Sequence, residues 1–253
     1  MSIWGKILGG AAGFALGGPL GALLGAVAGH AVDKMATDAK AVGAPDEEGV
    51  AQADPGTKQI AFTIGVIVLG AKLAKADGRV TPDEVSAFKE VFQIPPEEMK
   101  NVGRLFNQAR KDARGFEPYA KQIGRLFRDN PAVLEELLDG LFHIARADGR
   151  VSEEELDYLE QVAGLFGFSE GDWSRIRSAN VGAADGDPYA ILGVSPDDDD
   201  ATIKAVHRKL VLENHPDKLV AEGMPQEFID LANDKLAKIN ASYDKIRKAR
   251  GQT

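Results

Sequence analysis

A histidine, a proline and an aspartate stand together at residues 215–217, directly after a segment with helical periodicity that starts at residue 201. Apolar residues recur along one side of that segment, at Ile203, Val206, Leu210 and Val211. Pro216 lacks a backbone N–H and disfavours helical geometry at the residue before it, so the helix is expected to end there. The tip would expose one imidazole and one carboxylate, and such a carboxylate suits an arginine of another protein.

Basic residues occupy the faces of this segment that the apolar residues leave to solvent, at Lys204, Arg208 and Lys209. The simplest interpretation is a solvated amphipathic helix that ends at a proline. The flanking sequence favours a more specific one, because Asp187–Val194 precedes the helix and Lys238–Ile246 follows it. Together these segments resemble a J domain over residues 187–250, and we place that domain at 187–253.

The resemblance implies a short first helix, a basic second helix, the His-Pro-Asp loop and an antiparallel third helix. In this family the loop and the basic helix dock on a DnaK-type chaperone and stimulate its ATP hydrolysis. By analogy, the DnaK-binding residues here are His215, Pro216, Asp217, Lys204, Arg208, Lys209 and Lys218. Two positions depart from the family pattern: His207 replaces the usual tyrosine, and Asn214 stands where an aromatic residue often precedes the loop.

Composition excludes several classes of function. The chain has 253 residues, 44% of them hydrophobic, which is enough for a packed core. Its net charge of −9 disfavours nucleic acid as the main partner, because phosphate binding needs a basic surface. It has no cysteine, so it forms no disulfide and no cysteine-based zinc site.

Residues 1–34 are predicted to form a membrane anchor. Ile7 to Val32 is a run of 26 residues without Lys, Arg, Asp or Glu, which is long enough for a transmembrane helix. Glycines at every fourth position would form a stripe along that helix, at Gly5, Gly9, Gly13, Gly17, Gly21, Gly25 and Gly29. Small residues let helices in lipid approach closely, so we expect the anchor to form a homodimer.

Three alternatives to a spanning helix stay open. Ala26-Val-Ala28 offers a cleavage site of the kind found in secretory signals. The glycine stripe could instead pack within protein, and Gly17-Gly18-Pro19 could turn a re-entrant hairpin. The J-domain resemblance favours a single-pass anchor in a bacterial inner membrane with the bulk of the chain in the cytoplasm, where ATP-bound DnaK is found.

A small, acidic segment at 35–57 is typical of a flexible linker, and the pattern of residues 58–180 predicts helices throughout. The helical region repeats one motif, Ala74–Val85 and Ala145–Leu156. In each copy a glycine suits the left-handed residue that closes a helix. Thr81 with Glu84, and Ser152 with Glu155, form capping boxes that begin the next helix.

The repeated acids have two interpretations. Capping explains Glu84 and Glu155 and is the simpler one. The other is a shared metal site formed where the two copies of the motif meet, at Asp77, Glu84, Asp148 and Glu155. The motif resembles the second half of an EF-hand loop but lacks oxygen ligands at loop positions one and three, so ordinary calcium binding is not expected.

The doubled motif resembles a TerB-like helical domain over about residues 60–180, and Ser2–Leu8 with Gly29–Lys34 resemble the start of DjlA-type co-chaperones. This family places a TerB-like domain between the anchor and the J domain. Residues 181–186 form a hinge that is often longer in such proteins, so the J domain is expected to lie close to the TerB-like domain.

The sequence therefore predicts an all-α, membrane-anchored co-chaperone that recruits a DnaK-type chaperone and stimulates its ATP hydrolysis. It predicts no enzyme, because no nucleophile–base pair, phosphate-binding glycine loop or zinc motif is present, and it implies no cofactor beyond the metal considered above. Two alternatives are a metal-responsive stress sensor that works through the TerB-like domain, and a scaffold whose J domain is degenerate at His207 and Asn214. The client proteins are not encoded in any motif.

Overall fold

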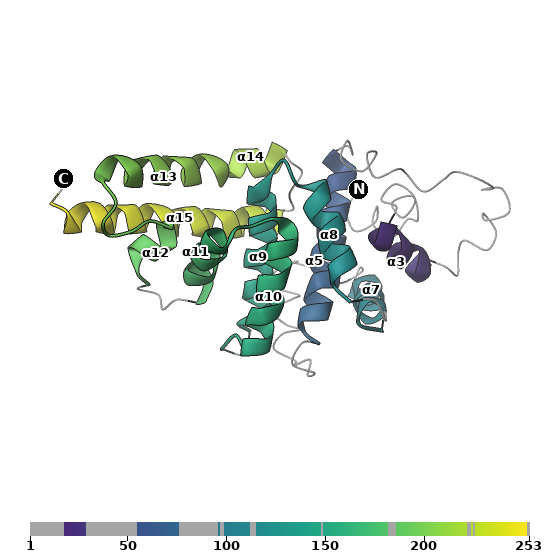
Figure 1. Ribbon diagram of the computed structural model, residues 1–253. Helices are drawn as coiled ribbons and strands as arrows, with labels where there is room; N and C mark the ends of the chain where they lie inside the picture. The colour runs from purple at the N-terminus through teal and green to yellow at the C-terminus, as the bar shows by residue number, and fades with distance from the viewer. Residues whose placement is uncertain are drawn as a thin grey trace.

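The computed structural model describes residues 18–28, 55–75, 96, 99–111, 115–147, 149–181, 186–221, 224 and 226–251. Within these ranges the chain is helical and has no strand, as predicted. A helical bundle lies at the centre, and two long antiparallel helices extend from one side of it (Figure 1). The bundle contains α5 (Pro55–Leu73), α7 (Met99–Lys111), α8 (Glu117–Leu126), α9 (Pro131–Ala145), α10 (Glu153–Phe166) and α11 (Glu170–Val181).

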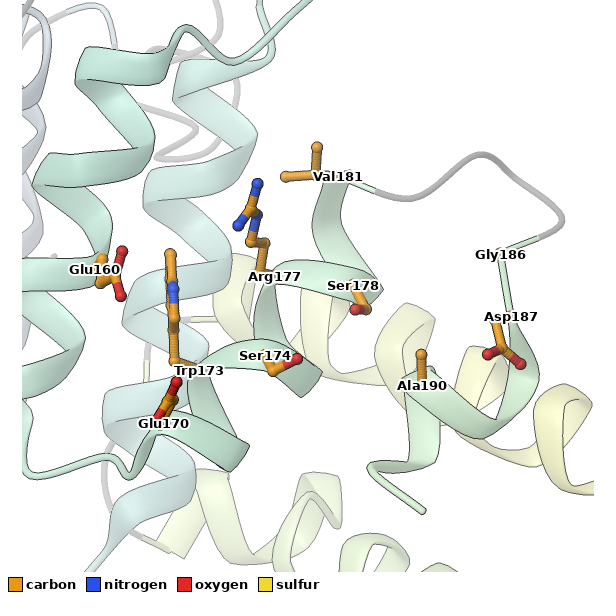
Figure 2. A pocket seen from close by; sticks show the side chains of 10 residues that line it. All are labelled: Glu160, Glu170, Trp173, Ser174, Arg177, Ser178, Val181, Gly186, Asp187 and Ala190. Carbon is orange, nitrogen blue, oxygen red and sulfur yellow. The ribbon is translucent and has the colours of Figure 1, made fainter. Parts of the chain in front are cut away.

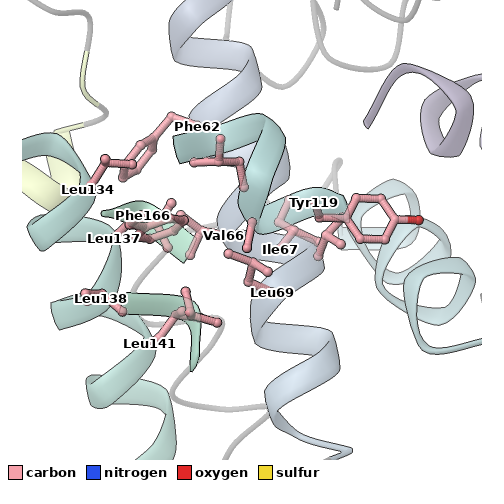
Figure 3. Close-up of a cluster of buried hydrophobic side chains, with 14 of the residues drawn as sticks. Phe62, Val66, Ile67, Leu69, Tyr119, Leu134, Leu137, Leu138, Leu141 and Phe166 are labelled. Carbon is pink, nitrogen blue, oxygen red and sulfur yellow. The ribbon is translucent and has the colours of Figure 1, made fainter. Parts of the chain in front are cut away.

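Helix α5 is the centre of the bundle core. Its residues from Ala61 to Leu69 are at most 1% exposed, because α7, α8, α9 and α10 all pack against it. Figure 3 shows Phe62, Val66 and Leu69 of this helix among leucines of α9 and Phe166 of α10. The Tyr158 hydroxyl of α10 donates a buried hydrogen bond of 2.9 Å to the Leu69 carbonyl. The apolar run of α5 is therefore a buried core helix, as its length predicts.

The joint between α9 and α10 has the predicted local structure. Gly149 has a φ of 100°, in the left-handed region that favours glycine. The Ser152 hydroxyl accepts a hydrogen bond from the Glu155 N–H, and the Glu155 carboxylate accepts one of 2.8 Å from the Ser152 N–H. This is a complete capping box. The first copy of the motif lies largely outside the described residues.

The C-terminal part contains α12 (Pro188–Leu192), α13 (Asp200–Glu213), α14 (Pro216–Ala221) and α15 (Gln226–Ala249). Its helices share a small core of Leu192, Ile203, Leu210, Ile239 and Ile246. The Asp199 carboxylate caps α13 by accepting a bond of 2.7 Å from the Thr202 N–H, and hydrogen bonds from the side chain and the backbone of Thr202 lower the pKa of Asp199. Arg250 closes the other end, because its guanidinium donates to the Tyr189 hydroxyl and to the Asp198 carbonyl.

Helix α3 (Gly18–Ala28) is the part of the anchor that the structure describes. It begins at Gly18, which has a φ of 55°, and it packs against α7 and α8 with Leu20 and Leu23 buried. The Leu20 N–H donates a bond of 3.0 Å to Gln122 of α8. In Figure 1, α3 lies on the opposite side of the bundle from α13 and α15. Among the described helices, Gly56–Leu73 of α5 is long and apolar enough to span a membrane, but 67% of this window is buried inside the protein.

Candidate functional site: the His-Pro-Asp turn and its basic helix

Asn214 ends the basic helix directly before the His-Pro-Asp turn. Its N–H donates a bond of 3.0 Å to the Leu210 carbonyl, and its side-chain amide donates a second, of 2.8 Å, to the same oxygen. The residue is only 1% exposed. An aromatic side chain could not take the buried position of the Asn214 side chain. The departure from the family pattern therefore has a structural role, because Asn214 caps the helix.

His215 and Asp217 form the exposed part of the turn. The Asp217 N–H donates a bond of 3.2 Å to Nδ1 of His215, which places the proton of the neutral imidazole on Nε2. The side chain of His215 is 50% exposed and that of Asp217 is 92% exposed. The turn therefore offers a carboxylate to a partner while its own backbone bond fixes the imidazole.

The turn is also the start of a helix, which the sequence analysis missed. Pro216 is the first residue of α14, and the N–H groups of Lys218 and Leu219 bond to the His215 carbonyl at 3.0 and 3.4 Å. Proline is favoured at the first helical position because its missing N–H would have no helical partner there. The sequence signal was present in the proline followed by an aspartate.

The predicted basic residues lie exposed along α13, as their spacing implies. Lys204, Arg208 and Lys209 all face solvent, and Lys218 does so on α14. The structure adds Arg247 of α15, which sequence reasoning did not select because it lies 30 residues beyond Asp217. Lys204, Arg208 and Arg247 line a shallow hollow of about 640 Å³ between α13 and α15. The cationic residues therefore lie on three helices, α13, α14 and α15.

Two large apolar side chains lie beside this surface. Leu212 on α13 is 61% exposed and Val220 on α14 is 55% exposed. They stand before and after the His-Pro-Asp turn in the chain. The site thus combines cations, one exposed carboxylate and two apolar contacts, which is the composition of a protein-binding surface.

His207 replaces the usual tyrosine and still contacts α15 from α13. Its ring stacks on Tyr243 at 4.0 Å between centroids and 6° between planes. Its Nε2 lies 2.9 Å from the Asn240 side-chain oxygen. An imidazole can thus pack these two helices together, and the departure from the family pattern gives no sign of a degenerate domain.

The other predicted site residues are only partly described. Of the seven glycines of the anchor, Gly21 and Gly25 lie on α3, and the other five lie outside the described residues. Of the four acids of the possible metal site, Glu155 is described, and its carboxylate serves the capping box. Asp77, Glu84 and Asp148 lie outside the described residues, so metal binding stays a prediction.

A second hollow, of about 560 Å³, lies where the bundle meets the C-terminal helices (Figure 2). Trp173, Ser174 and Ser178 of α11 line it on one side, and Asp187 and Ala190 line it on the other. Trp173 is only 7% exposed and stacks on Phe142 of α9. The tryptophan is therefore a core residue rather than a ligand platform.

Three family models match the chain in order. Residues 1–53 match the transmembrane domain of co-chaperone DjlA, residues 63–178 match tellurite resistance protein TerB, and residues 187–249 match the DnaJ domain. These matches confirm the order of an anchor, a TerB-like domain and a J domain.

Curated relatives match over nearly the whole chain. The co-chaperone protein DjlA of Photobacterium profundum is 30% identical over 98% of this chain and 99% of its own length. The DjlA proteins of Aliivibrio fischeri and Shewanella oneidensis are 32% and 33% identical, each over 99% of both chains. No solved structure matches the chain.

Proposed function

The chain belongs to the DjlA family of membrane-anchored J-domain co-chaperones, and from this premise we propose that it recruits a DnaK-type chaperone and stimulates its ATP hydrolysis. The stimulating element is the His215-Pro216-Asp217 turn. The recruiting element is the cationic face formed by α13 together with Lys218 and Arg247. The protein is a regulator of another protein's catalysis and not itself an enzyme.

The observation that carries this proposal is the exposure of the turn at the end of a cationic helix. The carboxylate of Asp217 is 92% exposed and stands between a helix with three exposed basic residues and the exposed Lys218, although the whole chain carries a net charge of −9. A local cationic face steers a partner with an acidic surface, while the exposed carboxylate selects an arginine on that partner. Leu212 and Val220 add apolar contact beside both.

The anchor would place this activity at a membrane. We propose a single-pass anchor in the bacterial inner membrane, with the TerB-like domain and the J domain in the cytoplasm, where ATP is available to the chaperone. We further propose that the glycine stripe joins two anchors into a homodimer. Tethering raises the effective concentration of the J domain near membrane-bound clients without any new contact.

Single-turnover ATP hydrolysis by DnaK tests the proposal. The wild-type chain in detergent should raise the rate, and Asp217→Asn and His215→Gln should each abolish the increase, because both remove the groups presented by the turn. Asp244→Asn is the matched control, since Asp244 is an exposed aspartate of α15 away from the turn. If the wild-type chain gives no increase, or if His215→Gln gives the same increase, the turn is not the stimulating element.

A further inference from the structure

The J domain is built on two hydrophobic cores, and only one of them is its own. The half that carries α12, α13 and the end of α15 has the small core described above. The rest, α14 and the beginning of α15, belongs to the core of the TerB-like bundle. The residues that enter the bundle core are at most 6% exposed: Leu219, Met224, Phe228, Ile229 and Ala232.

Phe228 is the centre of this contact. Its ring meets Phe62 of α5 edge-to-face, with 4.6 Å between centroids and 87° between planes. It also lies against Gly140 of α9, where an added Cβ would come within 2.7 Å of the Phe228 ring. A glycine at 140 thus leaves the space that the ring occupies.

Lys235 adds a buried ionic contact one to two turns further along α15. Its ammonium lies 2.6 Å from Glu135, 3.1 Å from Glu136 and 2.9 Å from Asp139, all three on α9. The lysine side chain is 11% exposed. Arg175 of α11 donates to both oxygens of the Glu135 carboxylate, at 2.8 Å to Oε1 and 2.5 Å to Oε2. Removing the lysine would leave buried carboxylates without their main counter-charge, which is strongly unfavourable.

Helix α12 of the J domain also packs against α11 of the bundle. The Arg175 stem packs beside Gly193, where an added Cβ would come within 2.9 Å of Arg175 Cδ. Next to this contact lies the hollow of Figure 2, so part of the boundary between α11 and α12 is open to solvent. Helix α9 therefore makes the buried ionic contact with the J domain and packs against Phe228, and α11 contacts α12 beside it.

The His-Pro-Asp turn lies between the two cores. The turn joins α13, which is held by the small core, to α14, which is held by the bundle core. Leu219 is fully buried and stands two residues after Asp217, and its N–H bonds to the His215 carbonyl. The angle of the turn therefore depends on both cores at once.

We propose that the TerB-like domain positions the His-Pro-Asp turn, with Phe228 and Lys235 as the positioning residues that seat the J domain on α9. This inference rests on the proposed function, because the turn must act on DnaK for its position to matter. Apart from Lys218 on α14, the cationic face lies on α13 and the end of α15, which the small core holds together. Unseating the J domain should therefore weaken stimulation more than recruitment.

Cutting the hinge tests the seating itself without DnaK. A protease site placed within residues 182–185 of the full chain, with an affinity tag at the N-terminus, leaves only non-covalent contacts after cleavage. The wild-type J-domain fragment should stay on the resin in detergent. Phe228→Ala and Lys235→Met should release it, while Lys238→Met, an exposed lysine on the same helix, should not. Release of the wild-type fragment, or retention of both variants, would overturn the inference.

Stimulation of DnaK at increasing concentrations of the full, uncut chain tests the positioning. Phe228→Ala and Lys235→Met should lower the maximal rate about fivefold or more and leave the half-maximal concentration within about twofold. Phe228→Leu, which keeps an apolar side chain in the socket, should recover most of the maximum. A variant that merely folds poorly behaves differently, because fewer active molecules raise the half-maximal concentration and leave the maximum unchanged.

If both variants reach the wild-type maximal rate, or if only their half-maximal concentration changes, the bundle does not position the turn. His215→Gln distinguishes failure of the proposed function from failure of this inference alone. If that variant stimulates like wild type, the proposed function fails and the inference fails with it. If it is inactive while Phe228→Ala and Lys235→Met are fully active, only the inference fails.

Discussion

At the scale of single residues, the least ordinary group is the carboxyl of Glu136. It is fully buried between α9 and α15, and one of its oxygens has no hydrogen-bond partner among the described residues. Burial raises its pKa to about 8, although Lys235 opposes the shift; Asp139 and Glu135 reinforce it. Glu135 differs: burial raises its pKa, but Lys235 and Arg175 outweigh burial and lower it to about 2.

The two shifts predict how stability changes with pH. Glu136 keeps its proton in the folded chain between its ordinary pKa of 4.5 and about 8, whereas the unfolded chain releases it. The free energy of unfolding should therefore fall as pH rises through this window, by at most about 1.4 kcal/mol per pH unit, and level off above it. Glu135 acts in the opposite direction below its ordinary pKa of 4.5, where its stabilising contribution is lost as the pH falls towards about 2.

Glu136→Gln should remove the fall in the free energy of unfolding that Glu136 causes as the pH rises. The reason is that the amide keeps the shape of the neutral carboxyl and carries no charge. We expect the melting temperature of the variant to fall less than that of the wild-type chain from about pH 6 to about pH 8. Intrinsic fluorescence of Trp173, which lies in the same bundle, reports the transition. Glu154→Gln, at an exposed position of α10, should follow the wild-type curve. Parallel curves for wild type and Glu136→Gln would show that Glu136 ionises freely in the folded chain.

At the scale of elements, the J domain packs on α9, and Gly140 of α9 leaves the space for the Phe228 ring. Gly140→Ala should destabilise the chain by about 1–3 kcal/mol, because the new Cβ would overlap the Phe228 ring. Gly164→Ala on α10 meets no atom within 4 Å and should instead stabilise the chain by about 0.5–1 kcal/mol through helix propensity. Urea unfolding followed by circular dichroism measures both. Equal and stabilising effects would mean that Phe228 does not occupy the space beside Gly140.

Local patterns made most elements predictable from the sequence. The apolar spacing of α13 indicated its buried face, and the Ser152–Glu155 pair indicated the start of α10. These features depend on residues three or four apart, where the chain's geometry alone brings side chains together. Helix α14 was missed because its six residues are too few for a periodic pattern.

The seating of the J domain could not be predicted in the same way. Lys235 and Glu136 are 99 positions apart, and a buried lysine has the same sequence signal as an exposed one. Phe228 would have suited either core of the J domain. A short hinge at 181–186 indicated that the two domains are close, but only the structure shows that they share a core.

At the scale of the whole molecule, the bundle separates the two functional ends. Helix α3 of the anchor region packs on α7 and α8, while the J domain packs on α9 and α11 (Figure 1). The TerB-like domain therefore connects α3 to the His-Pro-Asp turn through helices packed on one another.

Flotation of DnaK with membranes tests the central claim most directly. The full chain is reconstituted into vesicles of phosphatidylethanolamine and phosphatidylglycerol, mixed with DnaK and ATP, and separated on a density gradient. DnaK should rise with vesicles that carry the wild-type chain and remain at the bottom with Asp217→Asn. If DnaK remains at the bottom with the wild-type chain as well, the protein does not recruit the chaperone to the membrane.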